Sequence, residues 1–310
     1  MGDGVFCVLG AIVGAGFASG REIMQFFSSY GSFSWVLIPL AAGLMTFLLY
    51  RAAKGKEQTL RAGKIPFLRT LYILLYGAVA GGMTSAAGEL TALTVTLSFA
   101  RLAGSFGTLM LCAWISERNI RGMAFFGKLL APGMIAAFFL LFPLQKEPLE
   151  AVTPSVPSLL LSMVYLAGYC GLNAFLAGGT IRKAGETMNE QKRKKLSLLS
   201  GIAFGLLLLL GNFALLPRAG KVQRAPLPMV LLLRDYGKFG YYLSAVILYL
   251  AVSTTLIAAL QGMEFWMRGK RKAAWAALAA ALSSLMGFQE IVGKMYPILG
   301  WACLIVLLLP

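Results

Sequence analysis

The sequence predicts an all-α integral membrane protein of about ten transmembrane helices. Of its 310 residues, 58% are hydrophobic and 13% are charged, and the mean hydropathy is +0.76. A soluble domain of this length cannot bury so much apolar surface in one core. Apolar runs long enough to cross a ~30 Å hydrocarbon layer recur along the chain, and basic residues concentrate in alternate loops. We therefore expect a single transmembrane domain over residues 1–310, with the lipid bilayer as a partner.

The apolar runs place the helices in chain order. They lie near residues 4–28, 33–50, 67–88, 104–116, 123–143, 157–181, 196–216, 238–264, 273–287 and 291–309. The fourth and ninth runs are short for a membrane span, and the third could extend to Leu97.

The charges of the loops support this helix count, because cytoplasmic loops of membrane proteins carry an excess of Lys and Arg. Basic residues follow the second, sixth and eighth runs and surround the turn between the fourth and fifth, at Arg51, Lys54, Lys56, Arg61, Lys64, Arg69, Arg118, Arg121, Lys128, Arg182, Lys183, Lys192, Arg193, Lys194, Lys195, Arg268, Lys270, Arg271 and Lys272. Both termini are then cytoplasmic. The loop 218–238 is also basic, but it contains two prolines and the apolar stretch 229–233, so we expect an external segment with a short helix against the bundle.

Composition excludes several function classes. The formal charge of +16 lies in the short loops that membrane topology requires, so no nucleic-acid partner is expected. Histidine is absent and all four cysteines lie in apolar stretches, which supports neither a metal site nor a disulfide framework. The glycine clusters lack the G-x-x-x-x-G-K-[ST] pattern of an ATP-driven pump. Without histidine, the usual chemistries of an intramembrane enzyme are missing, so we predict no enzyme and no organic cofactor.

The first apolar run is predicted to be a discontinuous helix. Gly14, Gly16 and Gly20 lower the cost of unwinding, and the charge pair Arg21 and Glu22 follows them at membrane depth. Close packing of small residues is the alternative explanation for the glycines, but it does not account for the charges. Unwound backbone inside a membrane survives only where it is buried in protein or lines a wet cavity.

The sixth run is predicted to be broken in the same way. It carries Gly168, Gly171, Gly178 and Gly179, and the offset from Gly14 to Gly168 is 154 residues, almost half of the chain. Glycine-interrupted segments at corresponding positions of two halves are typical of transporters built from inverted repeats. We therefore predict a first inverted repeat of five helices over residues 1–143 and a second over residues 157–310.

The two predicted breaks form the candidate solute site. The ends of half-helices expose unpaired N–H groups, which suit a carboxylate, and C=O groups, which suit a cation. The candidate substrate-binding residues are Gly14, Ala15, Gly16, Phe17, Ser19, Glu22, Tyr165, Tyr169 and Asn173. Glu22 could bind a substrate amine, pair with Arg21, or carry a coupling proton. The two tyrosines are equally well explained by packing.

The stretch from Val13 to Ile23 resembles the first-helix signature of the YkvI-like bacterial membrane proteins, and the stretch from Gly287 to Pro297 resembles their C-terminal segment. The resemblance runs over most of the chain. It implies a bacterial inner-membrane protein similar to the amino acid–polyamine–cation superfamily, with the LeuT-like fold of five-plus-five inverted repeats.

The resemblance also implies a cation site. In sodium-coupled relatives, carbonyls of the broken first helix and a carbonyl and two hydroxyls of the eighth helix bind Na⁺, and the matching positions here are Gly10, Val13, Ala251, Thr254 and Thr255. An all-oxygen shell suits a hard alkali cation. The alternative is that the threonine hydroxyls bond their own helix backbone.

These features together favour a secondary active transporter of a small amino-acid-like solute, coupled to Na⁺ or H⁺ and working by alternating access around the breaks. The alternative is a non-transporting sensor or receptor subunit with a transporter fold. The pattern does not select the solute, the coupling ion or the oligomeric state.

Overall fold

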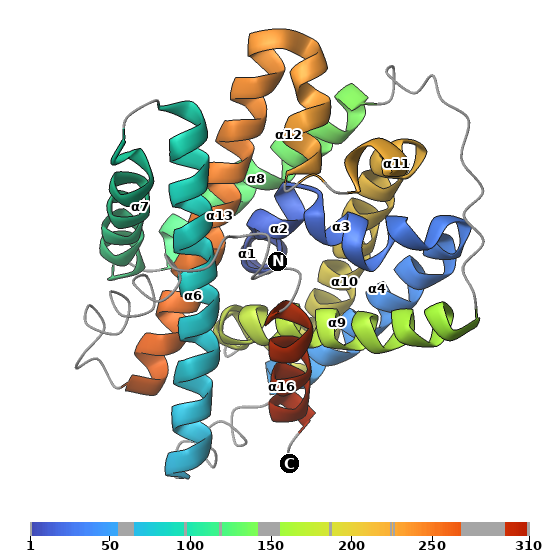
Figure 1. Ribbon diagram of the computed structural model, residues 1–310. Coiled ribbons are helices and arrows are strands. Elements are labelled where there is room, and N and C mark those ends of the chain that lie inside the picture. Colours follow the sequence, from blue (N-terminus) through green and yellow to red (C-terminus); the bar gives the residue numbers. More distant parts are fainter. Residues whose placement is uncertain are drawn as a thin grey trace.

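The computed structural model describes residues 2–54, 65–95, 98–117, 120–141, 156–185, 188–223, 225, 227–267 and 295–308, and every regular element in those ranges is a helix (Figure 1). The α-helices are α1 Gly2–Ile12, α2 Ala15–Ala18, α3 Arg21–Phe26, α4 Ser34–Lys54, α6 Pro66–Thr94, α7 Ala100–Glu117, α8 Ile120–Leu141, α9 Val156–Gly185, α10 Glu190–Leu215, α11 Ala219–Val222, α12 Pro228–Leu233, α13 Gly237–Met267 and α16 Tyr296–Leu308. Short 3₁₀ turns lie at η1 Ser28–Phe33, η3 Leu216–Arg218 and η4 Arg234–Tyr236.

Five helical stretches within the described ranges are long and apolar enough to cross a membrane. They are Ser28–Lys54, Pro66–Thr94, Leu159–Gly185, Glu190–Val222 and Pro228–Met267. Shorter apolar helices cover Lys128–Leu141 and Tyr296–Leu308. These elements match predicted runs, whereas the ninth predicted run, 273–287, and the start of the tenth lie outside the described residues.

The outer surface of the bundle is apolar. Large hydrophobic side chains such as Phe47, Met110, Phe139, Leu160 and Leu206 are about half exposed or more. Exposed apolar side chains on this scale suit lipid rather than water. The chain is therefore an integral membrane protein.

Basic side chains gather at one end of the bundle, called here the basic end, where they bind the last carbonyls of several helices. Arg51 donates to the carbonyls of Leu307 and Leu308 at 3.2 and 3.0 Å. Arg69 donates to Trp266 O at 2.7 Å. Cations at helix C-termini also complement the helix dipole.

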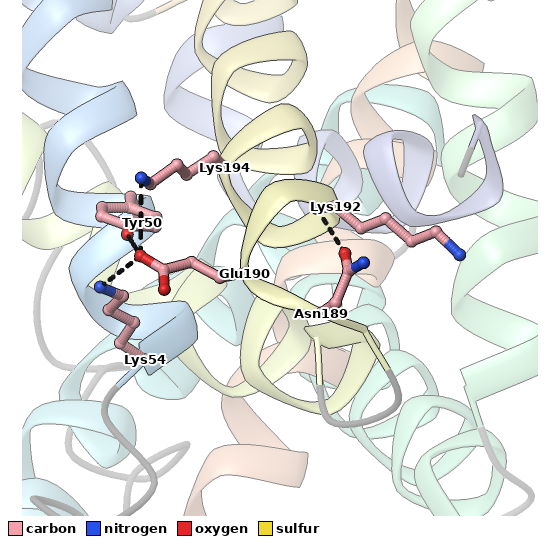
Figure 2. A network of polar contacts seen from close by, with 6 residues as sticks. All are labelled: Tyr50, Lys54, Asn189, Glu190, Lys192 and Lys194. Atoms are coloured by element: carbon pink, nitrogen blue, oxygen red, sulfur yellow. Dashed lines mark hydrogen bonds and ion pairs between the residues drawn. The ribbon is translucent and has the colours of Figure 1, made fainter.

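Helix α10 starts earlier than predicted, and its first turn joins the basic end. The Asn189 side chain accepts a hydrogen bond from the Lys192 amide at 3.0 Å and caps the helix. Figure 2 shows the side chain of Glu190, the first residue of α10, reaching toward α4. Its Oε1 accepts from the Tyr50 hydroxyl at 2.8 Å and pairs with Lys54 at 3.0 Å and Lys194 at 3.5 Å. The basic sequence therefore forms a solvated helix start rather than a loop.

The opposite end is closed by the segment from α11 to η4. The Met229 amide donates to Ser19 O at 2.8 Å, and Met229, Leu232 and Leu233 are buried. Tyr236 donates from its hydroxyl to Leu140 O. The prediction of a short helix lying against the bundle in this loop is confirmed.

The first three helices lie at the centre of the bundle, between α8, α9, α10 and α13 (Figure 1). Every residue from Cys7 to Gly20 is buried. A segment so enclosed by protein is the setting in which interrupted backbone can be stable at membrane depth.

Candidate functional site

The first membrane helix is interrupted twice, as its glycines predicted. Helix α1 ends at Ile12, and Gly14 is extended, with φ −88° and ψ −174°. After the single turn of α2, Gly20 adopts φ 78°, a left-handed conformation that strains residues with a Cβ. Helix α3 then begins at Arg21. The prediction of a discontinuous first helix is confirmed.

The break exposes backbone groups of both polarities. The Gly14 amide donates to Ile12 O at 2.9 Å instead of to Gly10 O, its acceptor in a continuous helix, so the Gly10 carbonyl loses its helical donor. The amides of Ala15 and Gly16 begin a new helical turn, where helices lack internal acceptors. Carbonyl oxygens and amide groups are thus offered next to each other inside the bundle.

Glu22 lies against this break. Its side chain is 3% exposed, and its carboxylate packs so closely on Gly16 that a Cβ there would be 2.2 Å from Oε1. Glu22 Oε2 has no hydrogen-bond partner among the described residues. The buried Tyr169 hydroxyl lies beside the carboxyl and likewise has no hydrogen-bond partner of good geometry in the described part of the chain. A desolvated carboxyl of this kind requires a proton, a cation or more donors.

Arg21 does not pair with Glu22, although the two are adjacent in sequence. Its Nη1 donates to Gln223 O at 2.7 Å and to Ala225 O at 3.4 Å, between α11 and α12. Neighbouring residues on a helix point in different directions, which explains the separation. Arg21 therefore holds the outer segment in place, and its charge is directed away from the candidate site.

Ser19 serves the local fold. Its hydroxyl donates to Gly16 O at 3.0 Å and accepts from the Arg21 amide at 3.3 Å. Its hydrogen bonds stabilise the tight turn between α2 and α3.

The predicted aromatic residues do meet near the break. Tyr169 stacks on Phe26 with ring centroids 4.8 Å apart, and Phe27 meets it edge-on at 5.6 Å. Phe17 and Tyr165 lie at the margins of the same cluster. Tyr169 is 1% exposed, so its ring packs while its hydroxyl faces Glu22. The packing role weighed for this tyrosine is therefore confirmed, and its role in solute binding stays a prediction.

The prediction that the sixth helix is discontinuous is wrong. Helix α9 runs without interruption from Val156 to Gly185. Its glycines instead allow α16 to pack closely, because a Cβ on Gly171 would be 2.6 Å from Leu304 Cβ and one on Gly300 would be 2.3 Å from Gly168 O. Small residues that let two membrane helices approach are a common interface.

Asn173 also serves the continuous helix. Its Nδ2 donates to Tyr169 O, one turn earlier, at 2.9 Å. The side chain is buried at 3% exposure, and its amide is partly used by this contact.

The candidate cation residues are brought together only in part. Thr255 Oγ1 is buried without a hydrogen-bond partner in the described residues, and it would be 3.1 Å from a Cβ on Gly14, so it faces the break. Thr254 donates to Ala251 O at 3.0 Å, which is the own-helix bond weighed as the alternative. Val13 and Gly10 are buried in the same region. The unsatisfied Thr255 hydroxyl fits an oxygen ligand for Na⁺, and the lone pairs of Thr254 Oγ1 remain able to accept.

Sequence reasoning missed two aromatic contributors. Phe204 of α10 packs near Phe17 and Tyr169, and the buried Tyr296 of α16 lies near the Glu22 charge. Aromatic residues inside apolar helices carry no sequence signal that separates lining from packing, so only the fold identifies them.

Two relatives were found among known proteins. The chain is 26% identical over 325 aligned residues to the uncharacterized membrane protein YkvI of Bacillus subtilis (strain 168), over 96% of this chain and 92% of the relative. It is 23% identical over 315 residues to the uncharacterized protein YyaD of the same organism, over 94% and 90% of the two chains. No protein-family model matches the chain. These similarities fit the YkvI-like family indicated by the first-helix motif.

Proposed function

We propose that this YkvI-like membrane protein is a secondary active transporter of a small amino-acid-like solute. The observation that carries the proposal is the buried Glu22 carboxyl, which has an unpartnered oxygen and lies against a broken membrane helix. Ionisable groups at membrane depth are costly and mark solute or ion pathways. Half-helix ends beside them are the usual binding elements of transporters.

In this proposal the solute spans the break. Its amine binds the Glu22 carboxylate, and its carboxylate accepts from the amides that begin α2. The Tyr169 hydroxyl is placed to contact either the solute or Glu22. Glu22 is 3% exposed and Tyr169 is 1% exposed, so neither side chain is open to a solute in this structure. Solute entry therefore needs the segments around the break to move apart, as alternating access requires.

Two coupling ions are compatible with these residues. Na⁺ would bind Thr255 Oγ1, Thr254 Oγ1 and the carbonyls of Gly10, Val13 and Ala251. A proton would bind Glu22 and neutralise it while the site is empty. Only the Na⁺ scheme uses the Thr255 hydroxyl, so a Thr255 variant separates the two schemes.

The proposed setting is the bacterial cytoplasmic membrane, with the basic end and both termini in the cytoplasm, because Lys and Arg concentrate there. We also propose a LeuT-like arrangement of two inverted five-helix repeats. The uninterrupted α9 departs from that arrangement, so the proposed site depends on a break in the first helix alone.

The test is uptake of radiolabelled amino acids into proteoliposomes, run with an inward Na⁺ gradient and, separately, with an inward proton gradient. Under Na⁺ coupling, Thr255→Val abolishes Na⁺ stimulation, since it removes the hydroxyl at nearly constant volume. Under H⁺ coupling, Thr255→Val leaves the response to the proton gradient intact, whereas Glu22→Gln abolishes uptake in either scheme because it removes the partner of the solute amine. Ser253→Ala is the matched control, because the Ser253 hydroxyl donates to Tyr249 O at 2.7 Å in its own helix.

Binding without uptake would contradict the transporter proposal. A solute that raises the melting temperature in a Glu22-dependent way, but is never accumulated under either gradient, would instead assign the chain to the sensor class.

A further inference from the structure

A separate cavity lies between α6, α7, α9 and α13. Its volume is about 400 Å³, within the range of pockets that hold small organic ligands. On α13 the lining begins at Ala258, one turn after Thr255, and continues to Trp266, whose carbonyl is bound at the basic end by Arg69. The cavity therefore occupies the inner half of the bundle, between the break and the basic end.

One wall of the cavity carries a guanidinium with one unpartnered N–H group. Arg182 lines the cavity, and its Nε is buried with no hydrogen-bond partner among the described residues. Tyr72 and Tyr76 of α6 line the same cavity, so Arg182 lies on the side of α9 that faces α6. A buried N–H without an acceptor is costly. A carboxylate in the cavity can satisfy it with the two parallel bonds characteristic of arginine once the guanidinium turns to bring Nε to the cavity wall.

Another wall offers flat apolar surface. The Tyr72 and Trp266 rings stack with centroids 4.1 Å apart at 25°, and Tyr72 also stacks on Phe175 at 5.4 Å. Both Tyr72 and Trp266 line the cavity. Rings fixed in this way present a rigid surface on which a planar or apolar group packs at little entropic cost.

The charge of the described lining is positive. Arg182 and Lys183 contribute two cations, and Glu264 contributes one carboxylate. This balance favours an anionic ligand over a cationic one.

We propose that this cavity is a second ligand site, which binds a small organic carboxylate with a flat apolar body. The carboxylate pairs with Arg182, and the apolar body lies against the Tyr72 and Trp266 rings. Binding here does not require transport.

The first experiment measures binding to the purified protein in a nonionic detergent by isothermal titration calorimetry. The probes are 3-phenylpropionate and phenethylamine, which share the ring and chain but carry opposite charges. We expect 3-phenylpropionate to bind and phenethylamine to bind at least tenfold more weakly. Preferential binding of phenethylamine would overturn the proposal, and inorganic phosphate displacing 3-phenylpropionate at equal concentration would reassign the cavity to phosphate groups such as those of lipids.

Two variants localise the binding. Arg182→Ala is expected to weaken 3-phenylpropionate by roughly tenfold to a hundredfold, as the loss of a charge-assisted hydrogen-bond pair predicts. Gly179→Leu places an apolar side chain in the cavity, because Gly179 lines it and a Cβ there meets nothing within 4 Å. Gly43→Leu is the matched control, since Gly43 is another exposed helical glycine with open space around it.

We expect binding to be lost in Gly179→Leu and retained in Gly43→Leu. Unchanged binding in both Arg182→Ala and Gly179→Leu would refute the site. If the Arg182→Ala protein does not fold, the binding measured for Gly179→Leu is the deciding result. The proposed function is tested separately, because Glu22→Gln is expected to abolish solute uptake and leave 3-phenylpropionate binding intact. Wild-type protein that binds 3-phenylpropionate through Arg182 but transports nothing would refute the transporter proposal and support this site.

Discussion

Substitution of Gly300 by alanine is expected to force α16 away from α9. A Cβ at this position would lie 2.3 Å from Gly168 O and 2.6 Å from Gly168 C, both of which are backbone atoms in the middle of a helix. Comfortable carbon contacts lie near 3.5–4.0 Å, so the helices must separate locally by about 1 Å. A flexible side chain could turn aside, but the backbone of α9 cannot.

The magnitude follows from two opposing effects. Replacing glycine by alanine inside a helix stabilises it by about 0.5–1 kcal/mol, whereas overpacking a close interface costs about 1–3 kcal/mol. Gly43→Ala experiences the first effect alone, because nothing lies within 4 Å of a Cβ on Gly43. The difference in unfolding free energy between Gly300→Ala and Gly43→Ala therefore isolates the packing cost, and we expect about 1–3 kcal/mol.

The measurement is equilibrium unfolding of the two purified variants in the same detergent, followed by circular dichroism. Equal stability of Gly300→Ala and Gly43→Ala would refute the assignment of the α9 glycines to helix packing. It would restore the explanation in which Gly168 and Gly171 permit α9 to unwind.

Three further predictions concern the first helix and the basic end. Gly16→Ala is expected to displace the Glu22 carboxylate, since the new Cβ would be 2.2 Å from Oε1; solute uptake should fall at least tenfold in an assay normalised to folded protein, and normal uptake would show that the Glu22 position is unimportant. Arg21→Gln is expected to free the outer segment, because the guanidinium holds the carbonyls of residues 223 and 225; amide exchange should rise in residues 219–233, and unchanged exchange would contradict the anchoring role. Glu190→Gln is expected to change the melting temperature very little, since its ion pairs are exposed and exposed pairs contribute little; a large drop would show that the contacts of Figure 2 hold α4 to α10.

The first helix was predictable because two independent signals coincide there. Glycines alone indicate either close packing or unwinding, but Arg21 and Glu22 have no place in a continuous lipid-facing helix. The structure accounts for the glycines and for Glu22, because Gly20 adopts a left-handed conformation and Glu22 is buried against Gly16.

The sixth helix could not be predicted from its own residues. Gly168 and Gly171 have no charged residue nearby in the sequence, so their pattern is equally typical of a helix interface and of a break. The deciding feature is Gly300, which is distant in sequence and becomes a neighbour only when α9 and α16 pack side by side (Figure 1). Thr254 and Thr255 are likewise indistinguishable in the sequence, because they are adjacent residues of the same type. In the structure the Thr254 hydroxyl bonds its own helix, whereas the Thr255 hydroxyl is unsatisfied at the break among the described residues.

The asymmetry between the two helices bears on how the proposed transporter would move. A continuous α9 keeps its backbone hydrogen bonds and is locked to α16 by glycine contacts, so it behaves as a rigid element. The first helix has already lost the hydrogen bond between Gly14 and Gly10, and a hinge there breaks no further helical bonds. Motion of α1 against a fixed α9 would open the site toward the N-terminal side of the bundle, where Gly4 lies near Leu196 of α10. We therefore expect a disulfide between cysteines introduced at Gly4 and Leu196 to stop solute uptake and reduction to restore it, whereas uptake through the cross-linked protein would show that α1 is not the moving part.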